Sequence, residues 1–280
     1  MKRIKRSLQK ALSLAGCLSF LLSACTSGEQ EIPEPGVLQP LEITADIDTR
    51  TRAAGTEPAV TGSNYDKRSF VTDDRITVTK TGGTSTQADY YYNGTRWLPV
   101  SGTGITTTGG ESFTASYPTS FSGILANQAS YQAFWKSNKL VSSATAAGNL
   151  VKFSFAPAAA KITVVVEYAD ATHIGESVKV KGATVLTASG PATEEITLLG
   201  LTTTGAKHTY AGIINPGTKA YTITVTTTGN AAQTYSQTSK TLSAGHNYIY
   251  NFSSTSNLIL NSVSVVGFTD QTEIVGGDAT

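Results

Sequence analysis

The chain has 280 residues, 21 basic and 20 acidic side chains, and a formal net charge of +1 at pH 7. Its two cysteines, Cys17 and Cys25, both lie within the first 25 residues. The rest of the sequence therefore excludes disulfides, a cysteine nucleophile and cysteine-ligated metal sites.

The first 24 residues have the pattern of a secretory signal. MKRIKR is a cationic start, and the apolar run ALSLAGCLSFLLSA extends from Ala11 to Ala24. This run suits a signal core, because a bilayer span needs about 20 residues. It closes with Leu22-Ser23-Ala24-Cys25, which resembles a bacterial lipobox. That resemblance implies cleavage before Cys25 and acyl chains on its sulfur and new amino group, a stable anchor in the outer membrane. The alternative is an ordinary signal peptide that happens to contain Cys25.

Removal of this leader changes what the charge implies. Without its first 24 residues the chain of 280 residues has 256. The leader contains five of the 21 basic residues and no acidic one, so 16 basic and 20 acidic residues remain, a net charge of about −4. Nucleic-acid binding requires a basic face, so we expect no nucleic-acid partner. A chain of this size can hold one large core or two ordinary ones.

A tether and a strand follow the leader. Residues 25–40 combine proline, glycine and acids with little apolar content, which predicts a lipidated tether. Residues 41–49, LEITADIDT, alternate apolar and polar side chains, which is the period of a half-buried strand. The core-facing set is Leu41, Ile43, Ala45 and Ile47. Two arginines follow directly, Arg50 and Arg52, and form a paired target for an Arg-specific protease.

Short strands separated by turns continue from there to residue 268. Asn93-Gly94 in DYYYNGTRW is a strong hairpin signal, and Gly229-Asn230 predicts a second, longer hairpin over 221–237. The strands expected before residue 157 are RITVTK (75–80), SFTASYP (112–118), YQAFW (131–135) and LVKFSFA (150–156). Those expected after it are KITVVVEY (161–168), SVKVKGATVL, EEITLLGL, HTYAGII, NYIYNF (247–252) and LILNSVSVVGF (258–268).

The composition agrees with an all-β chain. Thr, Ser, Val, Tyr and Gly dominate, and beyond the leader no window of about 11 residues shows a helical stripe. Many short strands at a spacing of about ten residues indicate sandwiches or barrels. We expect two tandem sandwich domains, 41–156 and 157–280, divided where Pro157 and three alanines interrupt two strong strands.

The sequence contains no recognisable catalytic or metal-binding motif. The three histidines, at 173, 208 and 246, lack metal-ligand spacing, and no GxSxG elbow occurs. The glycine-rich stretch 102–110 lacks the Lys-Ser/Thr ending and the following helix of a phosphate loop. We therefore expect no enzyme activity, no cofactor and no metal; an enzyme on a β-sandwich, such as a glycosidase or protease, is the least favoured reading.

Acidic pairs and aromatic side chains are the remaining candidates for a site. Paired carboxylates can serve a glycosidase or calcium, but Asp46 and Asp48 fit the solvated face of a strand, Asp73-Asp74 fits a turn, and Glu194-Glu195 shows no stronger signal. Tyr90, Tyr91, Tyr92 and Trp97 could stack on sugars, yet at least one face of their hairpin must fill a core. Core packing is the favoured role for these aromatics.

The order of these motifs resembles the fimbrillin family, the major and minor pilins of type V pili in anaerobic Gram-negative bacteria. The resemblance rests on the lipobox, on the strand followed by Arg50-Thr51-Arg52, and on motifs that recur in the family's order. Those motifs are DDRITV, YYYNGTRW, FTASYP, VKFSFAPAAAKITVVV, LSAGHNYIYNF and FTDQTEIVGGDA. Two positions depart from the family pattern, Phe268 in place of Trp and Ala156 in place of His.

The resemblance implies a fold and an assembly mechanism. Such pilins have two tandem transthyretin-like Greek-key β-sandwiches and reach the cell surface as lipoproteins. An Arg-specific protease then removes the anchored segment with its first strand, here 41–49, and a neighbouring pilin subunit inserts a strand into the vacated groove to build the fimbrium. The placeholder strand would prevent premature polymerisation. The implied role is adhesion, with a host or bacterial surface ligand.

The donor strand and the subunit's role stay open in the sequence. The expected donor lies within 258–280, with Leu258, Leu260, Val263, Val265 and Ile274 as its apolar residues, although the subunit could instead lack a free donor and act as a tip or anchor. The competing hypothesis is a surface lipoprotein that does not polymerise and binds glycan or a host ligand. Cleavage at Arg52 and polymerisation would separate the two.

Overall fold

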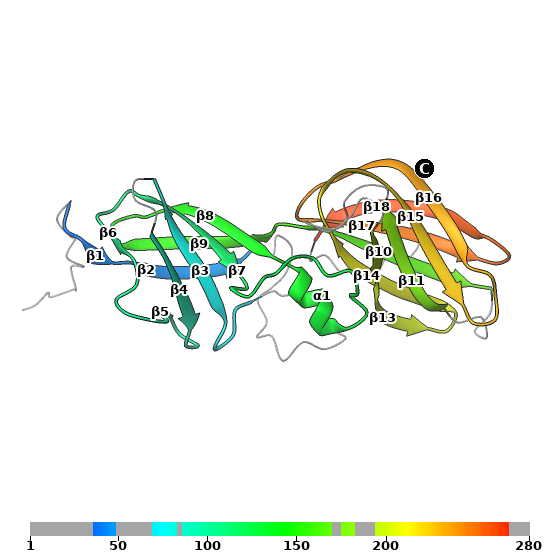
Figure 1. The fold of residues 1–280 in the computed structure, drawn as a ribbon, viewed down its shortest axis with the longest axis horizontal. Helices are drawn as coiled ribbons and strands as arrows, with labels where there is room; N and C mark the ends of the chain where they lie inside the picture. The colour runs from blue at the N-terminus through cyan, green and yellow to red at the C-terminus, as the bar shows by residue number, and fades with distance from the viewer. Residues whose placement is uncertain (1–35, 49–68, 83–85, 170–174, 183–193, 269–280) are drawn as a thin grey trace, which may run out of the picture. The chain divides into compact units, whose positions relative to one another are not determined.

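The computed structural model describes residues 36–48, 69–82, 86–169, 175–182 and 194–268. Within these ranges the chain is built almost wholly of β-strands, with one short helix, α1 (Tyr131–Ser137) (Figure 1). The expected all-β sandwich class is confirmed. No helix in the described part is long and apolar enough to cross a membrane.

The first group of strands forms a seven-stranded sheet and a two-stranded sheet. The larger sheet has the order β2-β9-β8-β7-β3-β4-β5, and β1 pairs with β6 in the smaller one. The bounds are β1 (Gln39–Pro40), β2 (Glu42–Ile47), β3 (Arg75–Thr81), β4 (Thr86–Tyr92), β5 (Trp97–Pro99), β6 (Thr106–Thr107), β7 (Ser112–Tyr117), β8 (Leu140–Thr145) and β9 (Leu150–Pro157). Alternating apolar side chains of β2, β3, β4, β7 and β9 fill one core between them.

The second group of strands forms a sandwich of two sheets. One sheet has the order β13-β14-β10-β17-β18 and the other β12-β11-β15-β16. The bounds are β10 (Ala160–Tyr168), β11 (Gly175–Gly182), β12 (Glu195–Thr197), β13 (Leu199–Thr204), β14 (Lys207–Ile214), β15 (Gly217–Thr227), β16 (Gln233–Leu242), β17 (His246–Ser254) and β18 (Leu258–Gly267). The inner faces of both sheets share one hydrophobic core.

The apolar run KITVVVEY forms the centre of the five-stranded sheet as β10. It pairs antiparallel with β14 and parallel with β17, so both of its edges are satisfied within the sheet. Ile162, Val164 and Val166 are fully buried on the inner face. On the opposite face, Lys161 and Thr163 are also buried. The strand is thus covered on both faces over much of its length, which accounts for its high apolar content.

Both predicted hairpins are present. Tyr92 pairs with Trp97 across the Asn93-Gly94 turn, where Gly94 has a φ of +93°. The second hairpin joins β15 to β16, with Val225 opposite Gln233 and Gly229 at a φ of +75°. Positive φ is the reason glycine is favoured at such turns.

The segment YQAFW is helical, so its assignment as a strand was wrong. It opens α1, whose N-cap is Ser130; the hydroxyl of this serine accepts a hydrogen bond from the Ala133 N–H at 3.2 Å. Phe134 is fully buried against Ala211, Ile213 and Phe268, so tertiary packing and the cap override the β propensity of Tyr, Phe and Trp. The expected strand EEITLLGL is also divided, at Leu198, into β12 and β13 of two different sheets.

The expected division into domains stays a prediction. All described residues belong to one unit that begins at Gly36, and Pro157 is the last residue of β9 rather than part of a linker. Gln128, fully buried, ties the segment before α1 to β14: its Oε1 accepts from the Ile213 N–H at 2.7 Å and its Nε2 donates to the Ile213 carbonyl at 2.8 Å.

Candidate functional site

The strand β2 is held at an edge by a single neighbour. It pairs in parallel with β9, from Glu42 opposite Leu150 to Ile47 opposite Phe155. The ladder between β8 and β9 in the described residues covers only Leu140↔Pro157 and Val141↔Ala156. Over residues 151–155, β2 is therefore the strand that pairs with β9 in the described structure, and its departure would leave an open edge there.

Leu41 and the inward-facing side chains of β2 complete the core. Leu41, Ile43 and Ile47 are buried, at 7%, 6% and 6% exposure, and Ala45 is partly buried against the same core. Val151, Phe153 and Phe155 of β9 are fully buried beside them. The alternation expected for 41–47 therefore places its apolar side chains in the core, as the period of a strand requires.

Two parts of the chain flank residues 39–48. The first is β9, called here the β9 wall, and the second is the turn of residues 104–111 that contains β6, called here the β6 wall. Gln39 lies opposite Thr107 and Pro40 opposite Thr106 in the antiparallel pair of β1 and β6. The Leu41 N–H then donates to the Ile105 carbonyl at 2.8 Å, while the Glu42 N–H donates to the Asn149 carbonyl at 2.8 Å. The chain therefore pairs with the β6 wall up to Leu41 and with the β9 wall from Glu42 onward.

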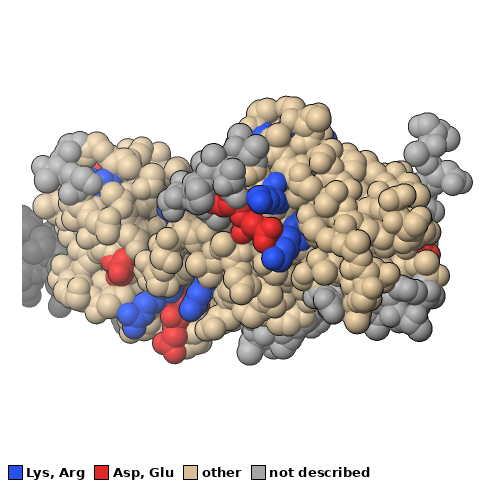
Figure 2. Space-filling view, turned by 45° about the vertical axis from the view of Figure 1, so that its right-hand side comes forward, with Lys and Arg blue, Asp and Glu red and all other residues tan. Residues whose placement is uncertain are grey.

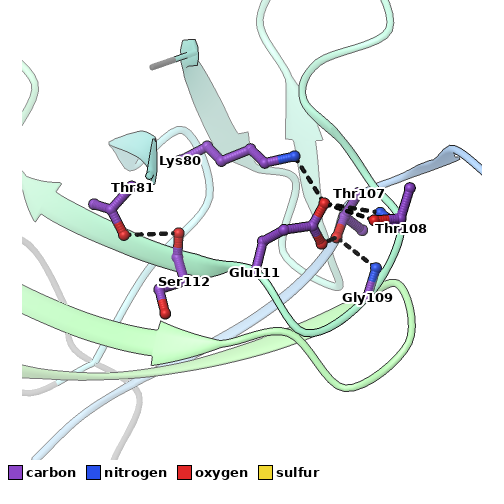
Figure 3. Close-up of polar contacts among 7 residues, drawn as sticks. All are labelled: Lys80, Thr81, Thr107, Thr108, Gly109, Glu111 and Ser112. Carbon is purple, nitrogen blue, oxygen red and sulfur yellow. Dashed lines mark hydrogen bonds and ion pairs between the residues drawn. The ribbon is translucent and has the colours of Figure 1, made fainter. Parts of the chain in front are cut away.

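Glu111 organises this turn through one carboxylate (Figure 3). Its Oε1 accepts from Lys80 Nζ at 2.8 Å, from the Thr108 N–H at 3.1 Å and from Thr108 Oγ1 at 2.9 Å, and its Oε2 accepts from Thr107 Oγ1. Burial alone would raise the pKa of Glu111, but the hydrogen bonds from Lys80, Thr107 and Thr108 outweigh it and hold the pKa far below its usual range. The carboxylate is therefore ionised at neutral pH and accepts all of these hydrogen bonds.

A buried tyrosine supports the same turn from the core. The Ile105 N–H donates to Tyr90 Oη at 2.7 Å, and both residues are about 1% exposed. Burial raises the pKa of Tyr90, and the hydrogen bond from Ile105 opposes this only in part. Gly104 has a φ of +70°, and a Cβ there would lie 2.6 Å from the Tyr90 hydroxyl, so only glycine allows this close approach.

Several predicted site residues lie outside the described part of the chain. These are the lipidation residue Cys25, the arginines Arg50 and Arg52, and the tail residue Ile274. The described chain reaches Asp48, whose N–H donates to the Phe155 carbonyl at 2.7 Å, and resumes at residue 69. Lipidation and cleavage at these positions therefore stay predictions.

The other expected donor residues lie in β18. This edge strand forms an antiparallel ladder with β17, from Leu258 opposite Ser254 to Gly267 opposite His246. Leu258 and Leu260 are half-buried against the sandwich core, whereas Val263 and Val265 are 38% and 46% exposed. A strand already paired in this way must leave β17 before it can enter another subunit.

The remaining candidates take structural positions. Tyr90 and Trp97 are buried in the first core, which agrees with the packing role favoured for them. Asp46 lies 3.8 Å from Lys152 in an exposed ion pair, and Glu195 lies 2.8 Å from Lys179. His208 is buried beside Tyr168 and Tyr210. No group of three or more His, Cys, Asp or Glu side chains suited to a metal occurs among the described residues.

Charged side chains on the face in Figure 2 form small groups that contain both signs, and uncharged residues cover most of the rest. Among the described residues on this face, the basic side chains do not gather into one extended surface. Among the described residues, the sequence did not predict that residues 39–48 lie between β9 and the β6 turn. The weak sequence signal of this arrangement is the run TTTGGE, in which threonine hydroxyls precede an acid in a glycine-rich turn.

Comparison with solved structures identifies the fold. A crystal structure of a candidate cell adhesion protein from Bacteroides ovatus matches with a TM-score of 0.62 at 17% identity, over 84% of this chain and 100% of that one. A candidate cell adhesion protein from Bacteroides uniformis matches with a TM-score of 0.57 at 16% identity, over 85% and 100%. A fimbrial protein from Bacteroides ovatus is more distant, with a TM-score of 0.44 at 14% identity over 80% and 49%.

No protein-family model and no curated protein matches the sequence. Two structures with TM-scores above 0.5 cover most of this chain and the whole of their own. The chain therefore has the fold of these two candidate cell adhesion proteins from Bacteroides.

Proposed function

We propose that this chain is a structural subunit of a surface fibre, a fimbrillin that assembles by strand exchange and serves adhesion. The observation that carries the proposal is the placement of β2: it completes the core and the β9 edge, yet Arg50 and Arg52 follow within a few residues of its end. Cleavage there would cut the covalent link between β2 and the rest of the chain. A segment with this position is suited to be a replaceable placeholder.

The energetics favour replacement over an empty groove. Burying each of Leu41, Ile43 and Ile47 is worth about 1.5–3 kcal/mol, on the order of 4–9 kcal/mol together before entropy. A typical domain has a total stability of about 5–15 kcal/mol, so a subunit without this strand has a strong drive to accept another. While the chain is intact, the tethered strand is present at high effective concentration and competes with any partner's strand.

The surface location belongs to the same proposal. The lipobox ending at Cys25 would anchor the precursor in the outer membrane, and cleavage after Arg50 or Arg52 would release the folded part for assembly into the fimbrium. The fold similarity to candidate cell adhesion proteins supports a role at the cell surface. The proposed partners are other pilin subunits, the Arg-specific protease and a host or bacterial surface ligand.

The proposal is tested on the chain that starts at Thr26, without lipid. Limited digestion with an Arg-specific protease, followed by an unboiled denaturing gel and N-terminal sequencing, should give heat-sensitive multimers whose chains start at Thr51 or Ala53. The double substitution Arg50→Ala and Arg52→Ala should give neither product, and Arg50→Lys with Arg52→Lys separates the loss of the protease target from the loss of charge. A cut chain that stays a monomer contradicts polymerisation and favours a ligand-binding surface lipoprotein.

A further inference from the structure

We infer that the strand-accepting site has a second wall, the β6 turn, which binds the residues that precede the core-facing strand of the partner. The partner segment would then extend from the position of Leu38 to that of Asp48, and not only over the length of β2. This inference rests on the proposed strand exchange and specifies what the exchanged strand must contain. The occupant is an extended segment of another subunit.

The backbone pairing defines the first requirement. Residues 39 and 40 pair antiparallel with β6, and the Leu41 N–H donates to the Ile105 carbonyl, before the parallel ladder with β9 begins. Asn149 Nδ2 also donates to the Pro40 carbonyl at 3.4 Å. A partner segment therefore needs a free backbone N–H at the position of Leu41, which excludes proline there.

The second wall is built from residues that stay after cleavage. Tyr90, Lys80 and Glu111 all follow Arg52 in the sequence, and the hydrogen bonds by which Tyr90 and Glu111 hold Ile105, Thr107 and Thr108 involve no residue of the 36–48 segment. With residues 36–48 in place, Thr107 and Ile105 are each 1% exposed. The turn is thus fixed by its own contacts, and a vacated site would keep the β6 backbone in position to accept a new strand.

A pocket at the start of the segment defines the second requirement. It has a volume of about 370 Å³ and is lined by Leu38, Lys80, Gly82, Thr86, Gly104, Ile105 and Thr106. Leu38 borders this pocket but is 64% exposed, so its side chain leaves much of the space unfilled. A larger apolar side chain at this position of the partner segment would bury more surface and bind more tightly.

The core-facing positions define the third requirement. Large aliphatic side chains are buried at 41, 43 and 47, and the smaller Ala45 lies between them. The segment recognised by the whole site therefore has an apolar residue at 38, a free N–H at 41, large aliphatics at 41, 43 and 47, and a small residue at 45. This pattern distinguishes the partner's strand from an arbitrary β-strand.

The test uses the chain from Thr26, nicked after Arg52, and measures displacement of its own N-terminal segment by synthetic peptides. A peptide of residues 36–48 should bind at least about tenfold more tightly than one of residues 41–48, since hydrogen bonds and apolar surface are both added. N-methylation of the Leu41 amide should weaken both peptides, because both contain the N–H that donates to the Ile105 carbonyl. Leu38→Trp should tighten binding of the long peptide, which alone contains residue 38.

Protein variants provide the matched comparison. Glu111→Gln should reduce the advantage of the long peptide to less than about threefold while the short peptide binds as before, because the β9 wall is unchanged. Glu195→Gln, which breaks another 2.8 Å ion pair far along the sequence, should leave both affinities unchanged. Should Glu111→Gln fail to fold, the peptide-side changes at 38 and 41 still decide the question.

If the long and short peptides bind the unsubstituted protein equally well, the β6 wall takes no part in binding the partner segment, and the proposal of strand exchange is unaffected. Failure of both peptides to displace the segment would overturn strand exchange itself.

Discussion

The backbone N–H of Ile105 donates a 2.7 Å hydrogen bond to the hydroxyl of Tyr90, inside the core. Tyr90→Phe should therefore lower the free energy of unfolding by about 1–3 kcal/mol, because a buried N–H loses its partner. Chemical denaturation monitored by circular dichroism measures this. Tyr92→Phe is the control, since the hydroxyl of Tyr92 makes no hydrogen bond within the described part of the chain. Equal stabilities of the two variants would contradict the supporting role of Tyr90.

Truncation of β2 should separate core-facing from solvent-facing positions. Ile43→Ala should lower the free energy of unfolding by about 2–4 kcal/mol, because it removes a side chain that is 6% exposed, whereas Thr44→Ala, on the exposed face, should change it by less than about 0.5 kcal/mol. In the nicked protein, the same Ile43→Ala should speed release of the N-terminal segment. A release rate equal to that of the unsubstituted segment would show that β2 is not held by its core contacts.

Local patterns predicted much of this fold because they act within a few residues. The alternation at 41–47 and the glycines at 94 and 229 specify a strand and two hairpin turns by backbone geometry alone. The segment YQAFW was wrongly assigned because Phe134 packs against β14, which is distant in sequence. The β6 wall was missed for the same reason: Tyr90, Lys80 and Glu111 meet at one turn only after the sheets form. A single residue whose partner is distant in the sequence leaves no periodic pattern from which the contact could be predicted.

The acid dependence of stability should reveal the Glu111 network. The pKa of Glu111 is lowered on folding from an ordinary value near 4.5, so its contribution is present above that pH and is lost as the pH falls below it. At pH 7, Glu111→Gln should lower the free energy of unfolding by about 1–2 kcal/mol, the range for hydrogen bonds to a charged group that is partly exposed. Denaturation curves at pH 7 and pH 3 should show the difference between the two proteins shrinking. A constant difference would mean that the carboxylate charge has no part in holding the turn.

Alkaline conditions should unfold the protein through its buried tyrosines. Burial raises the pKa of Tyr90, Tyr168, Tyr210, Tyr221 and Tyr250, so each binds its proton more tightly in the folded state. The stability they contribute is complete below the ordinary tyrosine pKa of about 10 and is lost as the pH rises above it. Tyrosinate absorbance should therefore rise in two steps, the second coinciding with loss of the circular dichroism signal. A single step with retained structure would contradict the burial of these hydroxyls.

The strand β18 should bind the groove of a second copy of this chain more weakly than the chain's own residues 38–48 do. Aligning Leu258 with Leu41 places Leu260 at position 43 and the small Ser262 at 45, which fits, but it places Ser264 at 47 and Thr255 at 38.

Loss of the buried aliphatic at 47 alone is worth about 1.5–3 kcal/mol, or roughly 10–150-fold in affinity. A peptide of residues 255–265 should therefore displace the N-terminal segment of the nicked protein at least about tenfold less well than the peptide of residues 38–48. Restoring the pattern with Ser264→Ile should recover most of this loss, while Ser262→Ile, which overfills the position of Ala45, should not. Equal displacement by the unsubstituted peptides would mean that the groove does not select its strand by these side chains.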